Sequence, residues 1–69
     1  MIWLILGEAS HQIIACNIHE ENNLFQLWVT RANGKTMKIQ EHADKNEIIF
    51  VKEAIDYAIE NGEKALKIS

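Results

Sequence analysis

The sequence predicts an α+β fold, in which a four-stranded antiparallel meander carries one amphipathic helix on a single face. Three observations support this prediction. Apolar and polar residues alternate over much of residues 11–41, which is the pattern of half-buried strands. The pair Asn33-Gly34 separates two of these alternating runs and is a strong hairpin signal. A segment with helical periodicity follows Asp44 and ends at a glycine.

The size and composition indicate one small domain, residues 1–69, with a formal net charge of -3. A chain of this length buries only about 60% of the surface that its unfolded form exposes, so small domains often gain stability from a second subunit. The one cysteine, Cys16, excludes an internal disulfide and is typical of a reducing compartment. The apolar run at residues 2–6 is too short to span a bilayer and lacks the basic start of a secretory signal. We therefore expect a cytoplasmic protein without membrane contact.

The first strand is predicted at Ile2–Leu6, because short continuous apolar runs are typical of strands covered on both faces. The alternating segment His11–His19 follows as the second strand. Pairing the two runs, with Leu6 joined to the first residue of the second, places Trp3 opposite Ile14. We expect these two side chains to face the core.

The next turn is predicted to contain four residues, Glu20–Asn23. This turn places Cys16 opposite Leu27 and Ile18 opposite Phe25. The apolar face then continues from the second strand into the third, and this agreement between separate local signals favours the register.

Two registers compete at the second hairpin. A two-residue loop, Asn33-Gly34, would set Val29 opposite Lys38, whereas a three-residue loop, Ala32–Gly34, sets Val29 opposite Met37. A slip of one residue moves every side chain to the other face, and only the longer loop produces a coherent apolar face. We therefore predict the three-residue loop. The apolar face of this hairpin comprises Phe25, Leu27, Val29, Met37 and Ile39.

The helix is predicted between Asp44 and Gly62. Asp44 is a good N-cap, Glu47 follows at capping-box spacing, and Gly62 provides a left-handed C-terminal stop. Its apolar stripe comprises Ile48, Val51, Ile55, Ala58 and Ile59, widened by Phe50, Ala54 and Tyr57. A stripe this wide predicts that one edge of the helix contacts something besides its own sheet.

The sheet face away from the helix is predicted to be apolar near the first strands, and exposed patches of this kind usually mark interaction sites. The candidate protein-interface residues are Trp28, Ile2, Leu4, Leu6 and Ile13. The tail, residues 63–69, has Leu66 and Ile68 in alternation, which predicts a short fifth strand, with a second helical turn as the alternative. This tail either leaves the patch exposed or folds over part of it.

A small basic cluster marks the tip of the second hairpin. Arg31, Lys35 and Lys38 lie there, with Trp28 on the same ribbon, and form a candidate nucleic-acid contact. Three positive charges in an acidic chain are a weak electrostatic footprint. Nucleic acid is therefore a less favoured partner than protein.

The sequence indicates no catalytic or metal-binding residues. Cys16 and His19 have the spacing of zinc motifs, but positions three apart on a strand point to opposite faces. Ser10 and His11 are adjacent on a strand, without a carboxylate placed to orient the imidazole. We therefore expect neither an enzyme nor a cofactor, and no small-molecule substrate.

Together these patterns favour a small protein-interaction module. We expect it to be a homodimer, or an adaptor or inhibitor of a larger protein. The alternative is a nucleic-acid-binding accessory protein that uses the basic hairpin tip.

Overall fold

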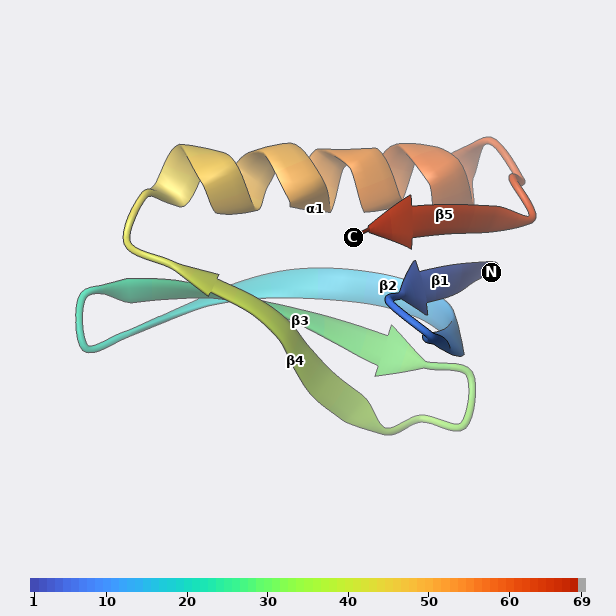
Figure 1. The fold of residues 1–69 in the computed structure, drawn as a ribbon, viewed down its shortest axis with the longest axis horizontal. Coiled ribbons are helices and arrows are strands. Elements are labelled where there is room, and N and C mark those ends of the chain that lie inside the picture. The colour runs from blue at the N-terminus through green and yellow to red at the C-terminus, as the bar shows by residue number, and fades with distance from the viewer. Residues whose placement is uncertain (69) are drawn as a thin grey trace.

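The computed structural model describes residues 1–68, which form one five-stranded sheet and one helix (Figure 1). The elements are β1 (Ile2–Leu6), β2 (Ala9–Glu21), β3 (Leu24–Arg31), β4 (Thr36–His42), α1 (Lys45–Glu60) and β5 (Ala65–Ile68). The strand order is β4-β3-β2-β1-β5. The predicted α+β class and the short C-terminal strand are confirmed.

The sheet differs from a plain meander because β5 pairs in parallel with β1. A parallel neighbour requires a crossover connection, and here α1 supplies it by carrying the chain from β4 across the sheet to β1. Figure 1 shows α1 lying along one face of the sheet. The buried core between them comprises Ile2, Leu4, Ile13, Cys16, Leu27, Val29, Ile48, Ile55 and Ala58.

The predicted limits of the helix are confirmed. Asp44 is the N-cap, and its Oδ1 accepts a hydrogen bond from the Asn46 amide at 2.9 Å. Gly62 has a φ of 67°, and the Glu63 amide donates to the Ala58 carbonyl at 3.0 Å. This closing pattern is a Schellman motif, which requires the left-handed residue that glycine adopts without Cβ strain.

The three-residue register of the β3–β4 hairpin is confirmed near its tip, where Val29 lies opposite Met37 and Gly34 has a φ of 88°. Farther from the tip, a bulge makes Ile39 an extra residue, so Leu27 lies opposite Gln40 rather than Ile39. Ile39 still packs against the core. The bulge therefore changes which residues of β4 share a face, and this decides the polar contacts described below.

The predicted β2–β3 turn was wrong in length. Glu21 pairs with Leu24, so the loop is only Asn22-Asn23, with φ values of 54° and 63°. Two consecutive positive φ angles are the signature of a type I′ hairpin turn, and Asn tolerates this region better than most residues. The register moves by two positions, which places Cys16 opposite Val29 and preserves the predicted core face.

We expect Asn23→Gly to raise the free energy of unfolding by about 0.5 kcal/mol, because glycine adopts positive φ without strain. Asn23→Ala should lower it by about 1 kcal/mol, because a Cβ atom is disfavoured in this region. Urea unfolding followed by circular dichroism measures both changes. The matched control is Asn17→Gly within β2, where glycine should destabilise the strand. A destabilising Asn23→Gly change would contradict the turn geometry.

The predicted faces of β1 and of the start of β2 were wrong. Ile2 pairs with Ile13 and Trp3 with Gln12, two positions from the expected register. A bulge at Ile14 interrupts the β2–β3 pairing between Ile13 and Ala15. This extra residue reverses the alternation, so Ile13 and Cys16 are both buried although they are three positions apart.

The reversal removes most of the predicted exposed patch. Ile2, Leu4 and Ile13 are buried under the helix, and Leu6 packs against the same core. Trp3 and Ile14, which were expected to face the core, are 47% and 46% exposed.

Candidate functional site

Trp28 is the one member of the predicted patch that stays on the helix-free face. It is held there by its neighbours, because its indole Nε1 donates to Gln26 Oε1 at 2.9 Å. The His19 ring meets it edge-on, with the ring centroids 6.1 Å apart. Trp28 is therefore half-buried, and its one hydrogen-bond donor already has a partner.

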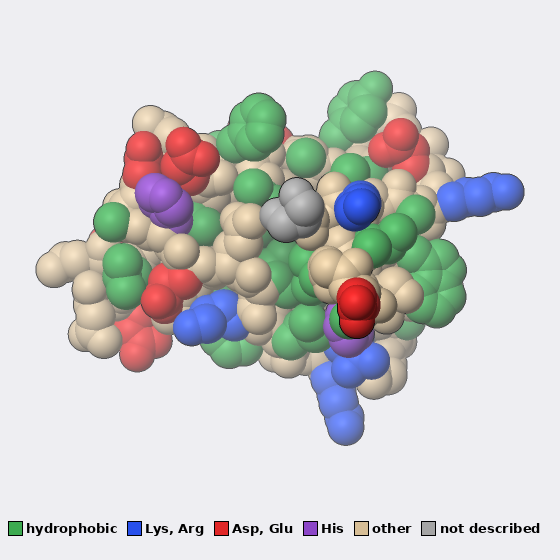
Figure 2. All heavy atoms as spheres, in the orientation of Figure 1, with side chains coloured by type: hydrophobic (Ala, Val, Ile, Leu, Met, Phe, Trp, Pro, Cys, Tyr) green, Lys and Arg blue, Asp and Glu red, His purple; other side chains and the backbone are tan. Residues whose placement is uncertain are grey.

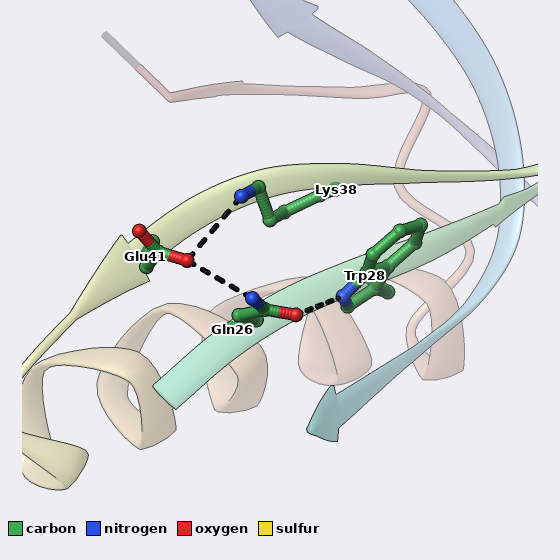
Figure 3. A network of polar contacts seen from close by, with 4 residues as sticks. All are labelled: Gln26, Trp28, Lys38 and Glu41. Carbon is green, nitrogen blue, oxygen red and sulfur yellow. Dashed lines mark hydrogen bonds and ion pairs between the residues drawn. The ribbon is translucent and has the colours of Figure 1, made fainter. Parts of the chain in front are cut away.

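The same network engages Lys38, one of the three basic residues that were predicted to contact nucleic acid (Figure 3). Glu41 Oε2 accepts hydrogen bonds from Gln26 Nε2 at 2.9 Å and from Lys38 Nζ at 3.3 Å. The bond from Gln26, and next the bond from Lys38, lower the pKa of the Glu41 carboxyl. The bulge at Ile39 makes this possible, because it brings Lys38 and Glu41 to the same face. Lys38 is thus paired with Glu41, whereas the ion pairs found within residues 1–68 include neither Arg31 nor Lys35.

Cys16 takes part in a contact that joins β2 to the helix. Its thiol donates to Asp56 Oδ1 at 3.2 Å, and Asp56 also forms an ion pair with Lys52 one turn earlier in α1. Burial is the main cause that raises the pKa of Cys16 to about 12, and the hydrogen bond to Asp56 adds to it. A protonated, buried thiol is a poor nucleophile. His19 lies on the opposite face against Trp28, as the strand spacing predicted.

The largest exposed apolar side chains of the helix are Phe50 and Tyr57, which are 73% and 63% exposed. Only Phe50 lines a shallow groove of about 380 Å³ between α1 and the two edge strands of the sheet. The groove residues are Gln40, Glu47, Phe50, Val51, Ala54, Leu66, Lys67 and Ile68. The wide helical stripe was the sequence signal for this surface, but the participation of β5 depended on its pairing with β1.

Within residues 1–68, strand β5 has no strand neighbour on the side away from β1. The Lys64 carbonyl accepts a hydrogen bond from the Trp3 amide at 2.9 Å, and Trp3 lies opposite Ala65 in the parallel ladder. Because backbone groups alternate along a strand, Leu66 directs its amide toward β1, whereas Ala65 and Lys67 direct theirs outward. An edge of this kind can pair with another strand.

Comparison with protein-family models, curated proteins and solved structures gives no match to this chain. Within residues 1–68, no helix is both long and apolar enough to cross a membrane. Over the same residues, His, Cys, Asp and Glu side chains form no group of three or more that could hold a metal ion.

Proposed function

We propose that this chain is a small protein-interaction module that acts as a homodimer through the free edge of β5 and the adjacent groove. The observation that carries the proposal is the coincidence of an unpaired strand edge with the exposed ring of Phe50 and the half-buried side chains of β5. Edge-strand pairing obtains affinity from backbone hydrogen bonds and specificity from side-chain pockets.

A second copy of β5 is a suitable occupant of this edge. A two-fold axis at Leu66 would place this residue opposite its own copy and Lys67 opposite Ala65. Such an antiparallel register keeps the half-buried side chains on one face and avoids a Lys67–Lys67 repulsion. It is also self-complementary, as a two-fold interface must be.

A stable dimer requires more buried area than β5 offers, so the contact must also include the helix. Standard interfaces bury roughly 800 Å² per partner, whereas the whole described chain exposes 4662 Å². Four residues of β5 cannot supply this area alone, so Phe50 and Ala54 must also be covered. Burial of the Phe50 ring would contribute about 1.5–3 kcal/mol.

Lys67→Pro is expected to convert the dimer to a monomer of 7.9 kDa, because proline lacks the outward amide. Proline is tolerated on edge strands, and the amides directed toward β1 remain intact. Lys67→Ala is the matched control and should stay dimeric, since it keeps the amide. Light scattering after size-exclusion chromatography, over a concentration series, measures the masses, and circular dichroism confirms that each variant is folded.

A second pair of variants tests the helix contribution. Phe50→Ser should weaken the dimer, whereas Tyr57→Ser should not, because Tyr57 does not line the groove. A parent chain that is monomeric at all micromolar concentrations would contradict the homodimer and favour an adaptor or inhibitor that awaits a different protein.

We also infer that the protein works in the cytoplasm. Its single cysteine supports this, because a lone thiol is typical of a reducing compartment.

A further inference from the structure

An exposed tryptophan borders a hollow that the proposed dimer contact does not use. Trp3 is 47% exposed and lies opposite Gln12 in the β1–β2 ladder. The hollow has a volume of about 250 Å³ and is lined by Trp3, Ser10, His11, Gln12, Arg31, Ala32 and Asn33. It forms where the β1–β2 hairpin meets the β3–β4 turn, and the Ala32 amide donates to the Gln12 carbonyl there at 2.8 Å.

Basic side chains gather at this end of the molecule. Arg31 lines the hollow, and its amide donates to the Lys35 carbonyl at 2.7 Å. On the other side, the Trp3 amide donates to the Lys64 carbonyl at 2.9 Å. In Figure 2, most of the blue side chains lie in the right half of the view, from β5 to the β3–β4 turn.

The remaining basic side chains are engaged elsewhere. Their contacts are Lys38 with Glu41, Lys52 with Asp56, and Lys45 above the ring of Phe25 at 5.8 Å. Over residues 1–68, no ion pair involves Arg31, Lys35, Lys64 or Lys67. Glu63 lies near Trp3 and Lys64, and Glu60 ends α1 three residues earlier. Among the residues that line the hollow, Arg31 carries a positive charge and none is acidic, although the whole chain has a net charge of -3.

We propose that this hollow binds single-stranded nucleic acid, with one base stacked on Trp3 and a neighbouring phosphate held by Arg31. An indole face stacks on any base, and a guanidinium group contacts phosphate with two parallel hydrogen bonds. The side-chain amides of Gln12 and Asn33 offer donors and acceptors to a base edge. A duplex keeps its bases stacked, so the site favours a single strand.

This assignment differs from the site expected at the hairpin tip. Trp28 is half-buried with its Nε1 bonded to Gln26, and Lys38 is paired with Glu41. Trp3 has the exposed ring that stacking requires, and Arg31 is the member of the predicted basic cluster that lines the same hollow.

Fluorescence anisotropy with labelled single-stranded DNA and RNA oligonucleotides tests the site. Trp3→Ala should weaken binding by about 5- to 150-fold, the range found for loss of one stacked base, and Trp3→Phe should recover part of the loss. Arg31→Gln should reduce the slope of log affinity against log salt by about 0.7, as expected for one phosphate contact. Lys38→Gln is the matched control, and it should change neither quantity.

Intrinsic fluorescence gives a second readout. The chain has two tryptophans, so Trp28→Phe leaves Trp3 as the only indole emitter. Its emission should be quenched by the single strand and not by a duplex of the same sequence. Equal binding by the parent and a folded Trp3→Ala variant would overturn the proposal and indicate general polyanion attraction. Absence of binding at low salt would overturn it as well and would reassign Trp3 to a protein contact.

Discussion

Replacing Ile13 with alanine is expected to lower the free energy of unfolding by about 2–5 kcal/mol. The same replacement at Ile14 should change it by no more than about 0.5 kcal/mol. The two residues are chemically identical neighbours, but Ile13 is fully buried in the core, whereas Ile14 is 46% exposed at the bulge. Urea unfolding monitored by circular dichroism measures both values.

Ile13→Ala leaves a large cavity that could unfold so small a domain. The milder change Ile13→Val keeps the protein folded, so that the two positions can still be compared. It should cost about 0.5–1.5 kcal/mol, while Ile14→Val should be neutral. Equal losses at the two positions, or a larger loss at Ile14, would contradict the bulge and return Ile14 to the core.

Alkaline solution is expected to destabilise the protein through the thiol of Cys16. The fold raises the pKa of this thiol from 9.0 to about 12, so the folded state favours its protonated form. The stability that the protonated thiol contributes is fully present below pH 9 and is lost as the pH rises from 9 toward 12. Between pH 7 and pH 10, the loss amounts to about 1.4 kcal/mol.

The variant Cys16→Ala isolates this effect, because it removes the thiol and keeps every other titratable side chain of the chain. The parent should lose about 1.4 kcal/mol more than the variant over this interval. At pH 8, the native thiol should also react with a disulfide reagent roughly a thousandfold more slowly than the unfolded thiol, since so little thiolate is present. Similar rates in the two states would show that Cys16 is accessible and ionised normally.

The ends of the helix and the loop of the β3–β4 hairpin could be predicted from the sequence, because single residues determine them. Asp44 sets the start of the helix, because its side-chain oxygen accepts a hydrogen bond from an amide of the first turn. Gly62 sets the end, because it adopts the left-handed conformation that terminates a helix. Gly34 likewise fixed the three-residue loop of the β3–β4 hairpin. Each of these signals acts over a few neighbouring residues, so it can be recognised in the sequence alone.

The faces of β1 and the start of β2 could not be predicted in this way. Ile13 and Ile14 are equally apolar, and only the packing of α1 decides which of them is the extra residue at the bulge. One inserted residue exchanges the two faces of everything that precedes it. This is why Ile2 and Leu4 were expected on the surface and lie in the core.

The surroundings of the candidate site residues could likewise be predicted where a local pattern decides, and not where tertiary packing decides. The wide helical stripe included Phe50, because helical period is a local property, and the fold leaves this residue 73% exposed. Trp28 and Lys38 were chosen for their chemical type, but Trp28 is bonded to Gln26 and Lys38 is paired with Glu41. The Lys38–Glu41 contact depends on the bulge at Ile39. Trp3 was missed because its exposure depends on the bulge at Ile14, which exchanges the two faces of β1.

The parallel pairing of β1 with β5 has a consequence for how the sheet assembles during folding. Every other pairing joins strands adjacent in sequence, whereas this one joins Trp3 to Ala65. The entropy cost of closing a loop grows with its length, so this ladder is the most expensive to nucleate from an extended chain. Docking of α1 on the three hairpins shortens that search by delivering β5 to its place. We therefore expect β5, one of the two edge strands of the finished sheet, to join it last.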